Sequence, residues 1–129
     1  RMRLLLDTHL ALWWEANHPR LTAEVKKMIR TEAESVFISR ASLWEIAIKV
    51  ATGRLKVDTA KFVRSVEKHG FEWLDIRNEH ILAVASLPNF EDHRDPFDRM
   101  LVAQSLAEPL QLLTADSVLA RYGATVHVV

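Results

Sequence analysis

Leu4-Leu5-Leu6-Asp7-Thr8-His9 is the stretch of the chain that decides its fold. Three consecutive apolar residues after a charged start predict a short strand that is buried on both faces. Leu10, Trp13 and Trp14 follow at helical spacing, so the acid lies where a strand ends and a helix begins. A strand that passes directly into a helix is the first half of a βαβ unit, which predicts a parallel sheet.

The rest of the chain continues this alternation. The expected strands are 4–6, 36–38, 71–76, 110–113 and 125–129, where apolar, β-branched and aromatic residues gather. The expected helices are 10–16, 21–30, 39–52, 59–68, 79–87, 96–107 and 117–121. This order predicts an α/β domain of three layers, with helices on both faces of a central, mainly parallel sheet of four or five strands.

Length and composition limit the kind of protein. A chain of 129 residues suits one compact domain, which we expect to be 1–129, and Arg1 ahead of Met2 is interpreted as a leftover of expression. The chain is 49% hydrophobic and 26% charged, which indicates a globular rather than a disordered protein. With no cysteine, the sequence excludes disulfides, thiolate zinc sites and cysteine nucleophiles.

Charge and hydropathy narrow the location and the partners. Lys+Arg and Asp+Glu are both 17, so binding of nucleic acid by bulk positive charge is not expected, although a local basic rim is compatible with this balance. No apolar run approaches the roughly 20 residues that span a bilayer. We therefore expect a cytoplasmic protein with no membrane partner.

Four acids are expected at one edge of the sheet. Asp7 and Asp116 follow the first and fourth strands directly, while Glu45 and Asp98 lie in the first turns of two helices. In parallel sheets, ligands bind beyond the carboxyl ends of the strands, where the strand order reverses. Clustered carboxylates repel one another unless a cation joins them, and hard cations such as Mg²⁺ or Mn²⁺ prefer oxygen ligands. Such a site can polarise a phosphoryl oxygen and activate water for phosphodiester hydrolysis.

Each acid also has a purely structural interpretation, which is the better one when each is taken alone. The shared edge favours a joint site, as does the helical line that Asp98 shares with Leu101 and Val102, since an acid on a buried stripe needs a partner or a metal. The structural roles are helix N-cap for Asp7, Asp95 and Asp116, a capping box for Ser42 with Glu45, and an i,i+4 ion pair for Glu45 with Lys49.

Four segments carry a resemblance to a known family. They are Leu4 to His9 with Leu12-Trp13-Trp14, Ile38 to Ile46, Asp95 to Gln104, and Leu112 to Asp116. Together they resemble the PIN domain, most closely the VapC-type toxins of bacterial toxin–antitoxin pairs. Each motif is weakly specific alone, but the set occurs in order over nearly the whole chain.

The resemblance implies an endoribonuclease that depends on Mg²⁺ or Mn²⁺ and acts as the toxin of such a pair. Asp7, Glu45 and Asp98 would be the principal catalytic and metal-binding acids. Asp116 would be the fourth, often through water. The supporting polar residues would be Thr8, Ser42, Thr114 and Asp95, the last mainly as a helix cap.

Further expectations concern partners. The resemblance implies an RNA substrate, with tRNA among the candidates, a cognate antitoxin that covers the groove, and a homodimer. Arg40 and Arg99 are candidate RNA-binding residues near the acidic edge, although ordinary solvated surface is the simpler interpretation of each. We expect His93 to be an exposed loop residue, and most of Trp13, Trp14 and Trp44 to pack in the core.

Other enzyme classes lack their motifs. The chain has no Gly-rich phosphate loop, no G-x-S-x-G elbow and no HExxH zinc motif, and His9 stands where a haloacid-dehalogenase-like phosphatase needs a second Asp. Two alternatives use the same fold. One is a non-catalytic PIN-like module that binds RNA or protein, and the other is a structure-specific DNA nuclease.

Overall fold

A computed structural model describes residues 2–129, and Arg1, with its interpretation as a leftover of expression, lies outside the described residues. The centre is a five-stranded sheet of order β3-β2-β1-β4-β5, in which all neighbouring strands are parallel. This confirms the predicted parallel α/β sheet. The strands are β1 Arg3–Leu6, β2 Ser35–Ser39, β3 Glu72–Leu74, β4 Gln111–Thr114 and β5 Val126–Val128.

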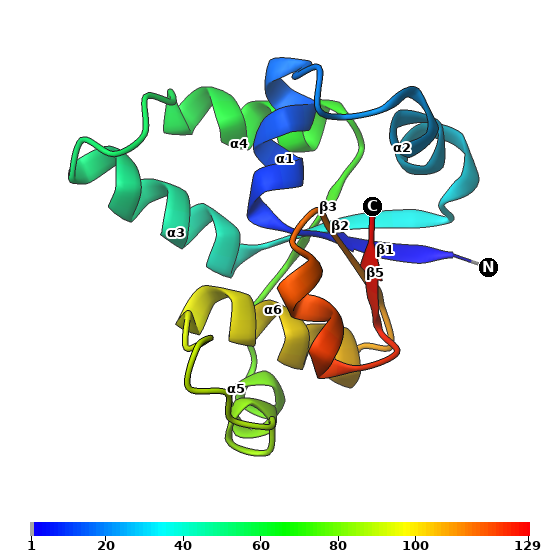
Figure 1. Ribbon diagram of the computed structural model, residues 1–129. Coiled ribbons are helices and arrows are strands. Elements are labelled where there is room, and N and C mark those ends of the chain that lie inside the picture. The colour runs from blue at the N-terminus through cyan, green and yellow to red at the C-terminus, as the bar shows by residue number, and fades with distance from the viewer. Residues whose placement is uncertain (1) are drawn as a thin grey trace.

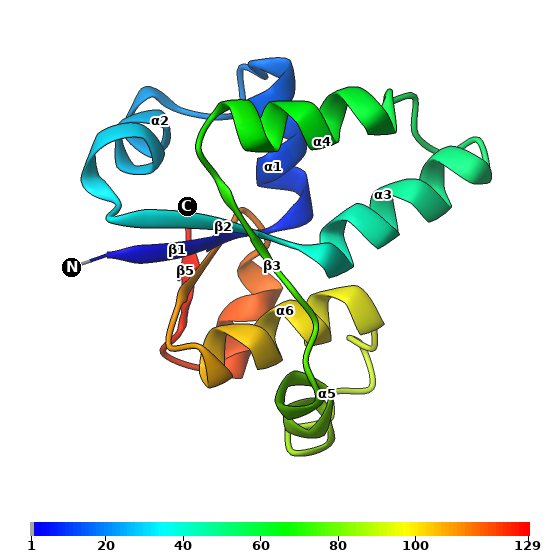
Figure 2. The same ribbon diagram turned by 180° about the vertical axis from the view of Figure 1, so that it is seen from behind.

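Helices cover both faces of the sheet. In Figures 1 and 2, α1, α2 and α4 lie on one side of the strands, and α5 and α6 lie on the other. The three-layer prediction is therefore confirmed. The helices are α1 Thr8–Ala16, α2 Ala23–Lys27 with its π-helical continuation η1 Met28–Glu32, α3 Arg40–Ala51, α4 Thr59–Lys68, α5 Asn78–Ala85, α6 Pro96–Ala107 and the 3₁₀ helix η2 Ser117–Tyr122.

The two halves of the core meet at β1. Leu4 and Leu6 pack with α1, α2, α3 and α4, whereas Leu5 packs with α5, α6 and η2. Successive side chains of a strand point to opposite faces, so a run of three leucines supplies both layers. Because both faces of β1 are covered, the strand is apolar throughout rather than alternating.

Strand order creates a switch point between β1 and β4. The chain adds β2 and β3 on one side of β1, then crosses to place β4 and β5 on the other. Leu6 pairs with Leu113, and the Asp7 amide donates to the Leu113 carbonyl at 2.9 Å. The residues that follow these two strands therefore lie side by side at the carboxyl edge, where ligands bind in open α/β sheets.

The helix start expected at 39 is confirmed, because α3 begins at Arg40 and its N-cap is Ser39, whose hydroxyl accepts the Ala41 amide at 3.0 Å. The capping box considered as the structural role of Ser42 and Glu45 is therefore wrong. Ser42 lies inside the helix, where its hydroxyl is fully buried. No helix among residues 2–129 is long and apolar enough to cross a membrane.

Candidate active site

Asp7 is held at the switch point from two sides. It is the N-cap of α1 and only 4% exposed. One carboxylate oxygen, Oδ1, accepts the His9 amide at 3.2 Å, and Oδ2 accepts a short hydrogen bond from the Thr114 hydroxyl at the end of β4. The predicted cap is thus confirmed, and the predicted supporting residue Thr114 contacts Asp7 directly.

Glu45 contributes an unpaired oxygen. It lies in α3, 5% exposed, and its Oε2 accepts from Lys49 Nζ at 3.0 Å, which confirms the predicted i,i+4 pair. Its Oε1 is buried and has no hydrogen-bond partner. A buried, unpartnered carboxylate oxygen is costly, so this atom suits a cation that would satisfy it.

Thr8 and Ser42 join the helices that carry Asp7 and Glu45. The Thr8 hydroxyl donates to the Ser42 hydroxyl at 2.8 Å, and both side chains are buried. This bond ties the first turn of α1 to α3. The supporting role expected for these two residues is therefore compatible with their positions, because they hold two acid-bearing helices together.

Asp98 completes a set of three interacting acids. It lies in the first turn of α6, whose N-cap Asp95 accepts the Phe97 and Asp98 amides at 2.8 and 3.1 Å. Burial, followed by the negative charges of Asp95, Asp7 and Glu45, raises the pKa of Asp98 to about 6. Carboxylates that raise one another's pKa share a small region of low dielectric.

Burial and a neighbouring negative charge also raise the pKa of Asp7. Burial raises the pKa of Asp7 above its usual value, and the charge of Glu45 adds to this, although the Thr114 hydrogen bond opposes it. Figure 1 shows why the acids meet, since the starts of α1, α3 and α6 approach one another at the carboxyl edge of the sheet. The structure therefore brings Asp7, Glu45 and Asp98 together.

Asp116 is more peripheral. It is exposed, and its Oδ1 accepts the Val118 amide at 3.0 Å as the predicted cap of η2. Its own amide donates to the Thr114 hydroxyl at 3.0 Å. Asp116 therefore stands at the switch point through its backbone, with its carboxylate at the solvent-facing rim.

The prediction that His93 is an exposed loop residue is wrong. Its side chain is 9% exposed, and Nε2 lies 3.2 Å from Asp98 Oδ2 while Nδ1 lies 2.8 Å from the Tyr122 hydroxyl. The sequence shows that His93 lies five residues before Asp98. The contact between His93 and Tyr122 could not be predicted from the sequence, because Tyr122 lies 29 positions further along.

Arg40 is the first residue of α3, and part of its side chain is exposed. Its Nε pairs with Asp75 at 3.0 Å, its guanidinium lies 4.6 Å from the centre of the Trp73 ring, and its side chain is 46% exposed. These contacts fix the side chain in a defined direction. They are compatible with a contact to RNA phosphate, which stays a prediction.

The guanidinium of Arg99 donates hydrogen bonds to other groups of the protein. Its guanidinium donates to the Pro88 carbonyl at 2.8 Å, to the Tyr122 hydroxyl at 3.2 Å, and more weakly to Val84 and Asn89. These contacts hold the loop before α6 against η2. The observed contacts support a structural role for Arg99 better than the predicted contact with RNA.

Most of the three tryptophans pack against the core, as expected. Trp13 and Trp14 pack against the core on the α1 side. Trp44 does not, since 59% of it is exposed and its ring meets Phe97 edge-on, with 5.1 Å between ring centres. Trp44 thus leaves a large apolar surface beside the acidic site.

A second cluster has closer ligand spacing. Among residues 2–129, one group of three or more metal-ligating side chains has its ligand atoms within 4.8 Å of one another. It consists of Glu79, His80 and Glu108. The acids at the switch point are therefore spaced more widely. His80 Nδ1 accepts the Arg77 amide at 3.0 Å, which leaves the proton on Nε2 to donate to Glu108 at 2.7 Å. The nitrogen that faces the cluster is thus already used, and the arrangement joins α5 to the end of α6.

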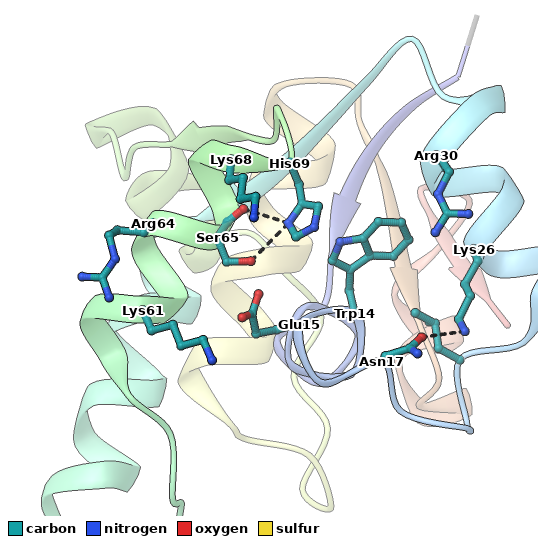
Figure 3. A pocket seen from close by; sticks show the side chains of 11 residues that line it. Trp14, Glu15, Asn17, Lys26, Arg30, Lys61, Arg64, Ser65, Lys68 and His69 are labelled. Atoms are coloured by element: carbon teal, nitrogen blue, oxygen red, sulfur yellow. Dashed lines mark hydrogen bonds between the residues drawn. The ribbon is translucent and has the colours of Figure 1, made fainter.

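A separate cavity lies away from the switch point. It measures about 640 Å³ and opens between α1, α2 and α4. Figure 3 shows Trp14 between two groups of basic side chains, one from α2 and η1 and the other from α4. The basic residues that line it are Lys26, Arg30, Lys61, Arg64 and Lys68.

Comparison with known families assigns the class of protein. Residues 4–124 match the PIN domain, so the chain belongs to the PIN domain family. Among curated proteins it is similar to "Ribonuclease VapC22" of Mycobacterium tuberculosis (strain ATCC 25618 / H37Rv), with 25% identity over 122 residues, 88% of this chain and 86% of that protein.

Two solved structures share the fold. One is that of VapBC2 from Rickettsia felis bound to a DNA fragment from their promoter, with a TM-score of 0.75, 15% identity, and coverage of 99% of this chain and 98% of that one. The other is that of DNA-bound VapBC from Salmonella typhimurium, with a TM-score of 0.66, 16% identity, and coverage of 100% and 98%.

Proposed function

We propose that this chain is a metal-dependent endoribonuclease and the toxin component of a toxin–antitoxin pair. The observation that carries the proposal is the meeting of Asp7, Glu45 and Asp98 at the switch point, where each lies on a different element and their charges raise the pKa of Asp98. The similarity to a ribonuclease supports RNA as the substrate, and the likeness to VapBC structures supports an antitoxin partner.

The residues present fit a hard divalent cation. The donors are carboxylate oxygens, which Mg²⁺ and Mn²⁺ prefer, and Glu45 Oε1 is a buried oxygen that lacks a partner. A bound Mg²⁺ or Mn²⁺ supplies Lewis-acid charge that polarises a phosphoryl oxygen and activates water. Asp7, Glu45 and Asp98 would hold the cation, with Asp116 assisting from the rim.

The chain's own residues prepare these acids for that role. The His9 amide and the Thr114 hydroxyl fix the orientation of Asp7. Lys49 neutralises one oxygen of Glu45 and leaves the other available. Because these groups are already oriented, little reorganisation is needed when a phosphodiester binds, which is the main source of electrostatic catalysis.

Substrate class separates this proposal from its alternatives. Partner-free protein should be incubated with RNA, single-stranded DNA and branched DNA in parallel, each with Mn²⁺ or with EDTA. The proposal expects Mn²⁺-dependent cleavage of RNA alone. Cleavage of branched DNA would instead indicate a structure-specific DNA nuclease. Binding of RNA without cleavage would indicate a non-catalytic module.

The toxin role has its own experiment. Induced expression of the wild-type chain in a bacterial host should arrest growth, and Asp7→Asn, which removes one site charge, should not. Glu67→Gln on the exposed face of α4 is the matched control and should arrest growth like the wild type. Growth arrest by Asp7→Asn would contradict toxicity through this site. An RNA substrate also makes the cytoplasm the proposed location.

The basic cavity is the surface that we propose for the antitoxin. Five lysines and arginines around Trp14 favour a segment with acidic side chains and an apolar residue. Arg64→Glu should weaken the complex with the cognate antitoxin by reducing its association rate and should leave RNA cleavage unchanged. Equal affinity of Arg64→Glu and wild type would contradict this placement.

A second copy of the chain is the proposed occupant of the apolar surface beside α3. Trp44 is 59% and Ile81 53% exposed. Trp44 and Ile81 also line a hollow of about 310 Å³ between α3, α5 and α6. Large apolar side chains grouped on a surface are typical of interaction sites. Sedimentation should show a dimer that Trp44→Glu dissociates; a monomeric wild type would contradict this.

A further inference from the structure

Four side chains form a continuous line of hydrogen bonds that ends on one of the proposed metal-binding acids. Arg99 Nη1 lies 3.2 Å from the Tyr122 hydroxyl, which lies 2.8 Å from His93 Nδ1. His93 Nε2 lies 3.2 Å from Asp98 Oδ2. Neither His93 nor Tyr122 has a part in the function described so far.

The direction of these hydrogen bonds follows from the groups at the two ends of the line. A guanidinium only donates, so the Tyr122 oxygen accepts from Arg99 and its proton is available to His93 Nδ1. An ionised Asp98 carboxylate only accepts, so it favours the arrangement in which His93 Nε2 carries the proton and Nδ1 accepts from Tyr122. A neutral imidazole that accepts at Nδ1 carries its proton on Nε2, and this N–H donates to Asp98 Oδ2.

The line is held rigidly. Tyr122 is buried at the end of η2, and its ring meets Phe90 edge-on, with 5.2 Å between ring centres, and His93 likewise at 5.5 Å. Arg99 is fixed independently by the Pro88 carbonyl. The donor that reaches Asp98 is therefore positioned by segments that are distant in the sequence.

We propose that His93 is a positioning residue for Asp98, set in the correct tautomer by Tyr122. By holding Oδ2, the His93 N–H stops the carboxylate from rotating and leaves Oδ1 to face a cation. Groups that hydrogen-bond to metal-binding carboxylates in this way fix the orientation of the ligand and tune its affinity. The inference rests on the proposed metal site.

The test is Mn²⁺ affinity of the RNA-free protein, measured by calorimetry. His93→Leu removes the donor and should weaken Mn²⁺ binding about 10-fold or more. His93→Gln places an amide N–H near the position of Nε2 and should retain most of the affinity. Tyr122→Phe keeps the ring but frees the tautomer, so its affinity should fall between those of the other two variants. His127→Leu, at an exposed position of β5, is the control and should bind like the wild type.

A second measurement determines which ring nitrogen of His93 carries the proton, and so the direction of its hydrogen bonds. Nitrogen NMR of the metal-free protein should show His93 with an unprotonated Nδ1 and a protonated Nε2. In Tyr122→Phe this preference should weaken. The opposite tautomer in the wild type would overturn the inference, whatever the activity of the protein.

The outcomes separate this inference from the proposed function. If the wild type and His93→Leu bind Mn²⁺ equally well, His93 merely supports its loop and the inference is wrong, while the proposed nuclease stands. If His93→Leu loses affinity and His93→Gln retains it, the positioning role is supported. If the wild type binds no Mn²⁺ and cleaves no RNA, both the proposed function and the inference are overturned.

Discussion

The Thr114 hydroxyl donates a short hydrogen bond to Asp7 Oδ2, and so joins the ends of two central strands that lie 107 positions apart in the sequence. The same hydroxyl oxygen accepts the Asp116 amide. One buried hydroxyl thus connects the acid after β1 to the acid after β4. This relationship links the topology of the sheet to the geometry of the site, because only adjacent parallel strands place these residues together.

Loss of that hydroxyl should affect both stability and activity. Thr114→Val keeps the shape but leaves the Asp7 carboxylate oxygen and the Asp116 amide unpaired, which should cost about 1–3 kcal/mol of unfolding free energy. Urea unfolding measures this, and RNA cleavage by the folded variant should also fall because Asp7 is no longer oriented. Thr114→Ser retains the hydroxyl and is the control. Equal stability of the wild type and Thr114→Val would show that the bond contributes little.

Stability in EDTA should depend on pH through Asp98. The pKa of Asp98 is raised from its ordinary value of 3.8 to about 6, so between these values the folded chain binds more protons than the unfolded chain. Folding stability due to this group is therefore lost as the pH rises from about 4 to about 6. Asp98→Asn carries no charge at any pH. Its melting temperature should exceed that of the wild type above pH 6, and this gain should shrink as the pH falls toward 4. A gain that is constant with pH would contradict the raised pKa.

Addition of Mn²⁺ should stabilise the folded chain. Ligand present at 100 times its Kd adds about 2.7 kcal/mol to the stability of a protein that binds it only when folded. We expect a rise in melting temperature that EDTA reverses, and a smaller rise for Glu45→Gln, because the amide removes the charge of a buried carboxylate. Glu67→Gln should respond like the wild type. An identical response of Glu45→Gln and wild type would remove Glu45 from the site.

The core should be sensitive at the sheet beneath the site. Leu112 is fully buried in β4, opposite Leu5 of β1. Leu112→Ala should lower the unfolding free energy by about 2–5 kcal/mol through lost burial and a residual cavity. Leu106→Ala, at a position that is 46% exposed in α6, should change it by less than about 0.5 kcal/mol. Similar losses in both variants would show that the packing at β4 differs from that described.

Sequence patterns predicted the fold well because its signals are local. The leucine run of β1, the caps Asp7 and Asp95, and the glycine after α3 each act within a few residues, where periodicity and capping chemistry are reliable. The Ser42–Glu45 capping box was wrong because Ser39, three residues earlier, already supplies the cap. The helix start expected at 39 agrees with the structure, whereas the capping box, which needed a start at Ser42, does not.

The site was predictable only in part. Carboxylates at strand ends and helix starts could be assigned to one edge from topology alone. The line from Arg99 through Tyr122 to His93 could not, because it depends on how η2 packs against the loop before α6. The same packing explains why Arg99, a candidate for contact with RNA, donates hydrogen bonds within the protein. Side chains from distant segments have no periodic signal in the sequence.

The most direct test of the account is cleavage of a mixed pool of tRNA and unstructured RNA by partner-free protein. It should be run with Mg²⁺, with Mn²⁺ and with EDTA, beside Asp98→Asn and the control Glu67→Gln. We predict cleavage that requires a divalent cation, is lost in Asp98→Asn while its fold persists, and is unchanged in Glu67→Gln. Cleavage that survives in EDTA or in folded Asp98→Asn would contradict a shared cation site of Asp7, Glu45 and Asp98.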